Sequence, residues 1–523
     1  MDCIEILNST SSKRQFMKFF NKLPILKLYQ QNLMGNYRSA LFWLKNHVIH
    51  NKGIQISNKQ PLPYPEVSGY YIPTLLLWGE RNLAMQFAKW LVSIQKQDGS
   101  WTDPENRSSY IFDTGQILKG LIALVDSCPE FQEPIIRGCD WLIRQRDSNG
   151  RLITPDTSQW HLPGGKTVPE AIHLYALEPV KKMGVKWGLP SYIDAIEQSS
   201  KYYLCDCNLT KFHTLSHFHA YIVEALVDLG HEKQAIEGMR DVAAYQNRRG
   251  AIPAYTDVNW ICSVGLFQYA LIWYKMGDLY NADRAFNYAC SLQNKSGGFY
   301  GSYGCRANYF PEEEISWVIK YFLDALWWKI KTSFDSSVSD FPDAIDYNDG
   351  RYHLVVQEIN NTKSMTVLDM GCGKGRFIKR IKEECPKIEA YGLDLSAKML
   401  ASLPEDIKPV QGSLLNIPFK DEYCDFAFCI EALEHAVNQK LAIHEMSRVI
   451  KPGGTLIIID KNKKLLGRLS ISPWEQWFSE DEITLLLRQE GLTVHVQRNI
   501  PYDGCDGRDG LFLGWIARKP QSL

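Results

Sequence analysis

The first part of the chain, up to about residue 330, alternates apolar segments at helical spacing with short polar turns. In the segment DTGQILKGLIAL, for example, Ile117, Leu121 and Leu124 fall on one face of a helix. One motif recurs between such segments: a helical run, then Gln, a polar turn and Gly, then another helical run. Its clearest copies, in which the Gln precedes the Gly by four residues, are 90–101, 243–252 and 290–299.

The spacing of these turns predicts six repeats. The turn glycines lie at positions 53, 99, 150, 250 and 297, with gaps of 46, 51, 100 and 47 residues, so one copy is missing near 200–212. Each turn precedes an apolar-periodic segment, which gives six helical hairpins of about 50 residues each. Such repeats bury their apolar faces against their neighbours. The pattern therefore predicts an all-α domain over residues 1–332, built as a closed ring of two concentric helix layers.

The pattern changes after this domain. Residues 333–353 are rich in Asp and Ser and poor in aliphatic residues, which is typical of a linker. From 354 to 523, short apolar runs alternate with helical segments, and this order predicts a parallel sheet covered by helices on both faces. The last two of seven predicted strands form an antiparallel hairpin. The strands are 365–370, 389–395, 408–412, 424–430, 453–460, 492–498 and 511–517.

Composition excludes several classes of function. The net charge is −1 and no block of basic residues is present, which argues against nucleic acid as a partner. The 13 cysteines contain no C-x-x-C pair, so we expect free thiols and no metal site. The N-terminus lacks the apolar core of a signal peptide, and no apolar run approaches the ~20 residues that cross a bilayer. We expect a cytoplasmic protein, and leave open its oligomeric state and a peripheral membrane contact through residues 14–35.

A glycine-rich turn, DMGCGKGRF at 369–377, follows the apolar run Thr366-Val367-Leu368 of the first predicted strand. Gly371, Gly373 and Gly375 remove side chains, so that the backbone can approach a ligand closely. A dinucleotide-binding turn would have the spacing G-x-G-x-x-G and would place a diphosphate at a helix N-terminus. Here the spacing is G-x-G-x-G and follows Asp369, whose carboxylate would repel a diphosphate and suit a cationic ligand.

The segments D-M-G-C-G-K-G, L-D-L, N-I-P-F, E-A-L-E-H and K-P-G-G occur here in order, and the region 354–523 resembles class I S-adenosylmethionine (AdoMet) methyltransferases. The resemblance implies a Rossmann-like, seven-stranded α/β fold with AdoMet as cofactor. Asp394 would accept hydrogen bonds from the ribose hydroxyls, and Ser413 stands where many members have Asp. The implied cofactor-binding residues are Asp369, Gly371, Gly373, Gly375, Asp394, Leu395, Ser413, Leu414, Ile430 and Glu431.

Methyl transfer from a sulfonium requires mainly that the nucleophile be aligned and water excluded. An oxygen nucleophile of high pKa also needs a base. His435 follows the fourth predicted strand, on the side where substrates enter this fold, and is the first choice. Glu434 is the second choice. The alternative for His435 is a structural histidine that caps the following helix.

The turn Gln95 to Trp101 resembles the Q-x-x-x-G-x-W repeat of squalene–hopene cyclases and related α/α-toroid proteins, which implies an (α/α)6 toroid. Neither the D-x-D-D nor the D-D-x-x-D motif of terpene chemistry is present, so the resemblance does not extend to cyclisation. One mouth of such a ring would carry the catalytic candidates Asp113, His217 and Glu313, with helix capping and packing as their alternative roles. Its further candidates are His161, Glu170, His219, Tyr255, Asp257, Trp260, Tyr303, Tyr309 and Trp317.

The fusion of the two predicted domains suggests the substrate. Toroids of this shape also serve carbohydrate-active enzymes, so we expect O-methylation of a sugar or glycan intermediate, as in polysaccharide biosynthesis, with the toroid binding or modifying the saccharide. A first alternative is methylation of an isoprenoid or other hydrophobic metabolite held in the toroid. A second makes the toroid a non-catalytic interaction module.

Overall fold

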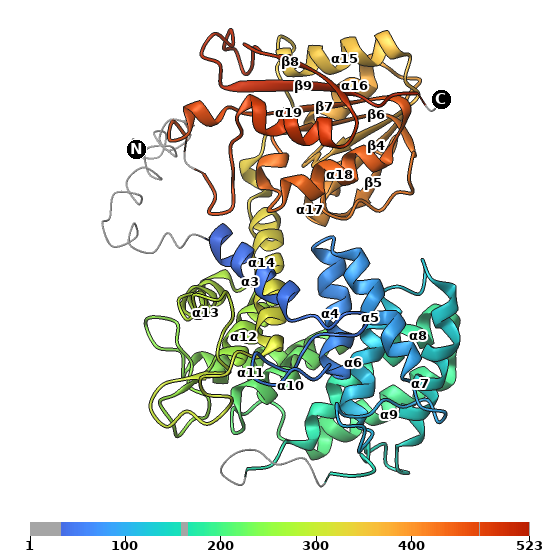
Figure 1. The fold of residues 1–523 in the computed structure, drawn as a ribbon, viewed down its shortest axis with the longest axis vertical. Helices are drawn as coiled ribbons and strands as arrows, with labels where there is room; N and C mark the ends of the chain where they lie inside the picture. Colours follow the sequence, from blue (N-terminus) through green and yellow to red (C-terminus); the bar gives the residue numbers. More distant parts are fainter. Residues whose placement is uncertain (1–32, 158–165, 470, 522–523) are drawn as a thin grey trace, which may run out of the picture.

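The computed structural model describes residues 33–157, 166–469 and 471–521. A helical part and an α/β part lie one above the other (Figure 1). Helix α14 (Ser316–Ser336) runs from the helical part to the α/β part (Figure 1). The predicted linker is partly helical, because its first four residues continue α14 and its last four lie in α15 (Gly350–Thr362).

The helical part agrees with the predicted helical content. Its helices before α14 are α3 (Leu33–Asn46), α4 (Pro65–Leu77), α5 (Arg81–Ser93), α6 (Ile111–Ile122), η1 (Pro129–Phe131), α7 (Gln132–Arg144), η2 (Glu170–Ala176), α8 (Leu177–Trp187), α9 (Pro190–Asp206), α10 (Ser216–Leu229), α11 (Glu232–Ala243), α12 (Ser263–Met276) and α13 (Leu279–Cys290). A short antiparallel pair, β1 (Ile261–Cys262) with β2 (Ser302–Tyr303), lies between them.

These helices fall into two groups. Helices α4, α6, α10 and α12 are buried along almost their whole length, whereas α5, α7, α11 and α13 bury one face. The buried helices contact one another in cyclic order. Helix α4 packs on α6, α6 on η2 and α8, these on α10, α10 on α12, α12 on α14, and α14 again on α4.

The repeated Gln–Gly turn joins neighbouring hairpins. Gly99 has a φ of 101°, and a Cβ there would lie 2.2 Å from the backbone oxygen of Arg137 in α7. Gln95 Nε2 donates to the backbone oxygens of Gly99, at 3.0 Å, and Pro134, at 2.8 Å. Gln293 makes the equivalent pair of bonds, to the oxygens of Gly297 and Asn36. The Gln therefore closes its own turn and binds the next hairpin, which explains why the motif repeats.

All seven strands predicted for the C-terminal part are present, with ends that differ from the prediction by up to three residues. The sheet order is β5-β4-β3-β6-β7-β9-β8, in which β9 is antiparallel to both its neighbours and the other pairs are parallel. The strands are β3 (Thr366–Met370), β4 (Glu389–Asp394), β5 (Ile407–Gln411), β6 (Cys424–Ile430), β7 (Ile450–Lys461), β8 (Thr493–Gln497) and β9 (Phe512–Arg518).

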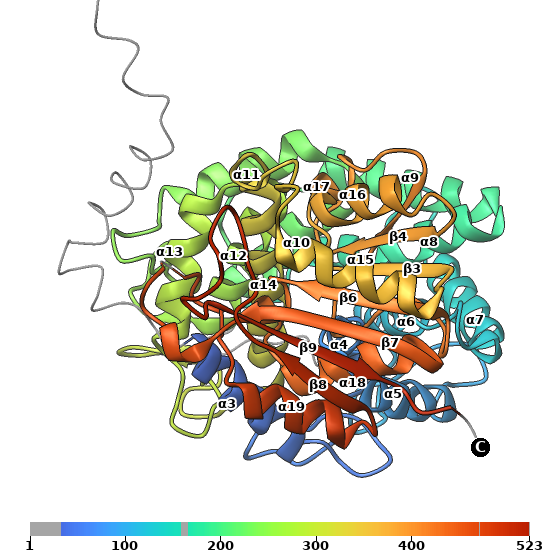
Figure 2. The ribbon, with the colours of Figure 1, turned by 90° about the horizontal axis from the view of Figure 1, so that it is seen from above.

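Helices cover both faces of this sheet, which accounts for its apolar strands (Figure 2). Alternate residues of one strand serve the two faces: Val367 packs with α15 and α16 (Arg376–Glu384), and Leu368 joins the core that includes α18 (Gln439–Val449) and α19 (Glu480–Gln489). The remaining short helices are η3 (Val338–Asp340), α17 (Ala397–Leu400), η4 (Leu433–His435) and η5 (Lys463–Leu465). The predicted seven-stranded, Rossmann-like architecture is confirmed.

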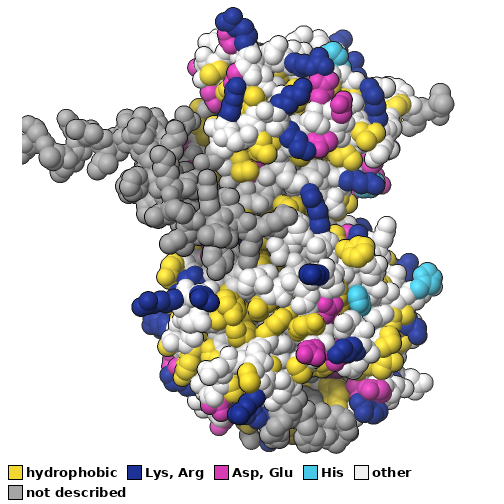
Figure 3. All heavy atoms as spheres, turned by 60° about the vertical axis from the view of Figure 1, so that its left-hand side comes forward, with side chains coloured by type: hydrophobic (Ala, Val, Ile, Leu, Met, Phe, Trp, Pro, Cys, Tyr) yellow, Lys and Arg dark blue, Asp and Glu magenta, His cyan; other side chains and the backbone are white. Residues whose placement is uncertain are grey.

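The surface fits the balanced composition. On the face in Figure 3, basic and acidic side chains are interspersed over both parts.

Within the described residues, every cysteine is a free thiol. No helix in the same residues is both long enough and apolar enough to span a bilayer.

The contact between α4 and α6 depends on two glycines. A Cβ at Gly120 would lie 2.2 Å from the backbone oxygen of Gly69, closer than van der Waals contact allows. We expect Gly120→Val to lower the free energy of unfolding by at least ~1–3 kcal/mol, because the two helices must separate. Urea unfolding of the full chain followed by circular dichroism measures this change.

The matched control is Gly238→Ala in α11, where an added Cβ comes no closer than 3.0 Å to another atom. This control should stay within ~1 kcal/mol of wild type, because the preference of helices for Ala over Gly opposes the cost of the contact with Val223. Equal losses in the two variants would contradict a close α4–α6 packing.

Candidate functional site

A cavity of about 980 Å³ lies where the two parts of the molecule meet. Its floor is formed at the carboxyl ends of β3, β4 and β6, which is where open α/β sheets bind their ligands. Its opposite side is formed by Trp78, which follows α4, by residues of α14, and by Phe341 and Pro342 after it. The volume is at the upper end of the usual range for small-molecule sites.

The glycine turn forms one wall of this cavity. Gly371, Gly373 and Gly375 have φ values of 80°, 55° and 79°, a region that only glycine adopts readily. A Cβ at Gly371 would lie 2.3 Å from Ala432 Cβ, whereas at Gly373 it would meet nothing within 4 Å. Gly371 and Gly373 border the cavity, and Gly375 caps the N-terminus of α16. The open space at Gly373 is where a ligand can approach the backbone.

Asp394, at the end of β4, is joined to this turn. Its Oδ2 accepts a hydrogen bond from Gly373 N and its Oδ1 accepts one from Ser396 N, both at 2.8 Å. Burial raises the pKa of Asp394, although these backbone donors oppose the shift. Both oxygens still have lone pairs, so the carboxylate can accept hydrogen bonds from hydroxyl groups of a ligand.

Asp369 is a buried acid with unused capacity. It is 2% exposed, and its Oδ2 has no hydrogen-bond partner among the described residues. Burial, and then the charge of Asp394, raise the pKa of Asp369 well above its usual value. Because two neighbouring acids are both costly to ionise here, the site favours a cationic ligand, which would lower this cost.

The other predicted cofactor-binding residues border the same cavity: Leu395, Ser413, Leu414, Ile430 and Glu431. Glu431 differs from the prediction in its contacts, because its Oε2 accepts hydrogen bonds from Arg351 Nη1, at 2.7 Å, and from Arg376 Nη2, at 2.5 Å. Burial alone would raise the pKa of Glu431. The two guanidinium groups lower it by more than burial raises it, so the pKa lies below its usual value. Glu431 is therefore an ionised carboxylate already engaged in ion pairs.

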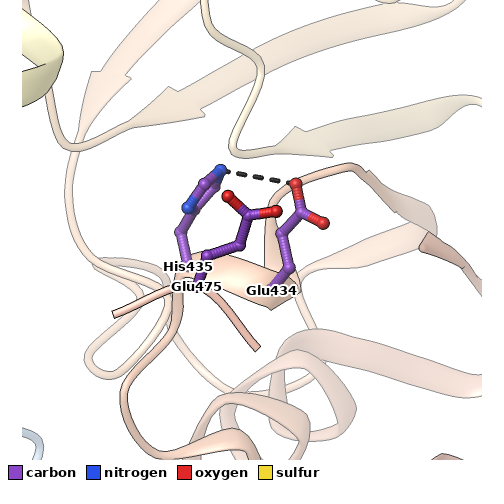
Figure 4. A group of neighbouring side chains, drawn as sticks. All are labelled: Glu434, His435 and Glu475. Carbon is purple, nitrogen blue, oxygen red and sulfur yellow. Dashed lines mark ion pairs between the residues drawn. The ribbon is translucent and has the colours of Figure 1, made fainter. Parts of the chain in front are cut away.

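The two base candidates lie in η4, at the edge of the cavity. His435 Nε2 is 3.5 Å from Glu434 Oε1 (Figure 4). The ring of Phe334 from α14 meets the imidazole edge-on, with centroids 5.2 Å apart. Burial lowers the pKa of His435 to about 4, so the imidazole is neutral at pH 7 but is a weaker base than an exposed histidine. The helix-capping alternative for His435 is wrong. Asn438 caps α18, and its side chain accepts a hydrogen bond from Leu441 N at 3.1 Å.

Glu434 is a poorer base. Its carboxylate accepts a hydrogen bond from Lys461 Nζ, and its backbone N–H donates to Asp460 Oδ2 at 3.0 Å. Burial and the neighbouring charge of Asp460 raise the pKa of Glu434 to about 10, and Lys461 only partly opposes them. At neutral pH Glu434 therefore holds a proton.

Two residues of this cluster were not found from the sequence, Lys461 and Glu475. Lys461 Nζ lies 3.7 Å from carboxylate oxygens of both Glu431 and Glu475. Glu434, His435 and Glu475 offer ligand atoms within 4.8 Å of one another, a spacing that could hold a metal ion (Figure 4). The ammonium group of Lys461 already supplies positive charge beside both glutamates, and the expectation of no metal stays a prediction.

The helical part carries three catalytic candidates, Asp113, His217 and Glu313. None of them borders the 980 Å³ cavity. Asp113 and His217 are buried, the latter with Nδ1 2.7 Å from Gln268 Oε1. Burial, and then Asp103, raise the pKa of Asp113 to about 7. The carboxylate of Glu313 accepts hydrogen bonds from Ser57 Oγ and Gln60 Nε2. His161 lies outside the described residues.

Sequence reasoning also missed Glu66, in the first turn of α4. Burial, and then the charge of Asp113, raise its pKa well above the usual value. No motif marks this residue, because its neighbour Asp113 is 47 positions away along the chain. The two buried acids are a polar feature of the helical part, separate from the cavity.

Comparison with known proteins places a methyltransferase-domain family match at residues 368–458. An uncharacterised protein of Methanocaldococcus jannaschii is 34% identical over 113 residues, which are 22% of this chain and 48% of that protein. A ubiquinone/menaquinone biosynthesis C-methyltransferase of Syntrophotalea carbinolica is 29% identical over 120 residues, 21% of this chain and 51% of that protein. The chain thus spans about half the length of these curated relatives.

Among solved structures, the YcgJ protein of Bacillus subtilis aligns over 33% of this chain and 100% of its own, with 16% identity and a TM-score of 0.27, too low to bear on function. The family match begins within β3 and ends within β7, and it includes the glycine turn, Asp394 and η4. The C-terminal part therefore carries a methyltransferase domain of the AdoMet-dependent class, as its motifs predict.

The charge cluster at the cavity edge yields a prediction about stability. We expect Lys461→Met to lower the free energy of unfolding by ~3–5 kcal/mol, because it removes the cation beside the acidic side chains of Asp460 and Glu475. Chemical denaturation of the full chain measures this loss. The control Lys451→Met removes a more exposed ion pair with Asp425 and should cost under ~1 kcal/mol. A loss no larger than that of the control would show that Lys461 does not compensate the cluster.

Proposed function

We propose that the protein is an AdoMet-dependent methyltransferase whose acceptor binds between the helical part and the α/β part. One observation carries the proposal. A single cavity is bordered on one side by the glycine turn and Asp394 and on the other by apolar side chains of the helical part, with His435 at its edge. Cofactor and acceptor could therefore meet without leaving the cavity.

The residues of the glycine turn suit AdoMet better than other nucleotides. Its sulfonium and ammonium groups would offset the cost of ionising Asp369 and Asp394, whereas a diphosphate would add to it. Asp394 would hold the ribose hydroxyls, and Leu395 would pack beside the adenine. AdoMet supplies an activated methyl group, so the chain itself has only to align the acceptor, exclude water and take up a proton.

The proton would pass to His435. Its ring borders the cavity, and burial keeps its pKa at about 4, so it is unprotonated over the neutral range. Glu434 would stay protonated beside it, and the ammonium group of Lys461 would limit the negative charge of the cluster. This arrangement supports His435 over Glu434 as the base for an acidic hydroxyl or carbon acid.

For the acceptor, we propose a compound with an apolar body. Trp78, Trp327, Ile330, Phe334 and Leu469 border the cavity opposite the cofactor-binding turn. Such a surface favours an isoprenoid or other hydrophobic metabolite over the sugar or glycan expected from the fusion, because a saccharide needs many polar partners. The quinone-related name of the Syntrophotalea carbinolica relative agrees with this choice, although that match covers about half of the relative.

The helical part would then act mainly as the wall of the acceptor site. We interpret the cyclic order of its buried helices as an (α/α)6 toroid, the arrangement that six hairpins need in order to cover one another's apolar faces. The described part of the helical region lines the cavity through Trp78 and α14. This role accounts for the fusion without a second catalytic activity.

Binding of the cofactor tests the first half of the proposal. Asp394→Ala should raise the Kd for AdoMet by about a hundredfold or more, because hydrogen bonds to a charged group each contribute ~1.5–3 kcal/mol. Isothermal titration calorimetry on the full chain measures Kd. The control Asp425→Asn, at the opposite end of β6, should leave it unchanged. A wild-type chain that binds no AdoMet would refute the proposal.

Transfer to the acceptor tests the second half. With methyl-labelled AdoMet, we expect label in prenylated phenols or quinols and none in oligosaccharides or lipid-free sugars. Trp327→Ala should raise the KM for the acceptor about tenfold and leave the KM for AdoMet unchanged, because it removes apolar contact area on the acceptor side alone. Label that enters saccharides and not apolar acceptors would return the function to sugar O-methylation.

A further inference from the structure

The last turn of α14 contacts the loop that carries Asp394. Asp335 Oδ1 accepts a hydrogen bond from Ser396 Oγ at 2.6 Å. Its Oδ2 accepts one from Lys331 Nζ, also at 2.6 Å, one turn earlier on the same helix. The side chain of Asp335 is only 13% exposed, so the carboxylate is held between the helix and the loop. The end of the helix that connects the two parts thus reaches the predicted cofactor site.

Ser396 stands directly between Asp335 and Asp394. Its backbone N–H donates to Asp394 Oδ1 at 2.8 Å, and its Oγ accepts a hydrogen bond from Met399 N at 3.1 Å, which caps α17. A serine hydroxyl has one proton to donate, and here that proton is directed to Asp335. The carboxylate of Asp335 therefore fixes the orientation of the hydroxyl that caps α17.

The loop after Asp394 has little rigidity of its own. Helix α17 has four residues, too few to be stable without outside contacts. Helix α14 has 21 residues and packs on α4 and α12 in the helical part. It also contacts α17. The long helix is therefore the more rigid support, and the short one depends on it.

We propose that Asp335 is a positioning residue for the cofactor, because it holds Ser396, and through it the loop of Asp394, in the conformation that binds the ribose. This inference rests on the proposed function and extends it. The affinity for AdoMet then depends on the helical part, although that part lies outside the methyltransferase domain. Asp335 also adds negative charge beside Asp394, where a cationic cofactor is favoured.

Titration calorimetry with AdoMet on the full chain tests this inference. Asp335→Ala should raise the Kd about tenfold, the effect of losing a hydrogen bond to a charged group. Asp335→Asn should stay within about threefold of wild type, because its amide oxygen can still accept from Ser396 Oγ. The matched control is Asp340→Ala, an exposed acid in η3 five positions further on, which should leave the Kd unchanged.

Kinetics with an acceptor found for the wild type separate positioning from general loss of structure. Asp335→Ala should raise the KM for AdoMet, with kcat and the KM for the acceptor within twofold of wild type. Ser396→Ala should raise the Kd at least as much, because it removes the hydrogen bond to Asp335 and also the cap of α17. The double variant should raise the Kd no further than Ser396→Ala, because the hydrogen bond that Asp335→Ala removes is already lost. If Asp335→Ala fails to fold, Ser396→Ala and Asp335→Asn decide the question.

The outcomes are distinct. A wild-type chain that binds no AdoMet refutes the proposed function itself. A wild type that binds AdoMet, together with an unchanged Kd in Asp335→Ala and Ser396→Ala, overturns the inference and leaves the function standing. A tenfold loss in Asp340→Ala also overturns it, because any acid near the end of α14 would then have the same effect.

Discussion

The packing of α14 is the interaction on which the arrangement of the whole molecule depends. Its first turns are buried between α4 and α12, and its last turns carry Phe334 and Asp335 to the methyltransferase domain. Phe334 meets the ring of His435, and Asp335 meets Ser396. One continuous helix thus connects the helical part to both the base candidate and the loop after Asp394. Its 21 residues span about 30 Å, which is long enough to reach from one part to the other.

Buried charge is the second constraint. It is balanced in different ways around Lys461 and around Asp369. Around Lys461, acidic side chains receive an internal cation, so that the cluster is compensated in the protein alone. Around Asp369, Arg376 is the cation among the described residues that lowers the pKa of this acid, and burial still raises that pKa well above its usual value. The acidic cluster around Lys461 therefore needs no ligand to balance its charge. Ionisation of Asp369, in contrast, would become less costly if a cationic ligand were bound beside it.

The sheet and its glycine turn could be predicted because both depend on local sequence: apolar runs of strand length, and glycines where φ is positive. Glu434 and His435 were found through a short local motif, whereas Lys461, Glu475 and Glu66 have no such motif. They become recognisable only when distant segments meet. The wall of the acceptor site is the extreme case, since Trp78 and Phe334 are about 250 positions apart, and no spacing rule joins them.

This last point bears on the acceptor. Among the described residues, the side of the cavity formed by the helical part comes from the end of α4, from α14 and from the residues that follow it. Their side chains at the cavity are mainly apolar, although the same helices carry Lys320 and Asp324 deeper in the helical part. Helix α14 thus carries polar side chains within the helical part, and apolar ones, Trp327, Ile330 and Phe334, at the cavity. The apolar acceptor that we propose would fit this change along α14.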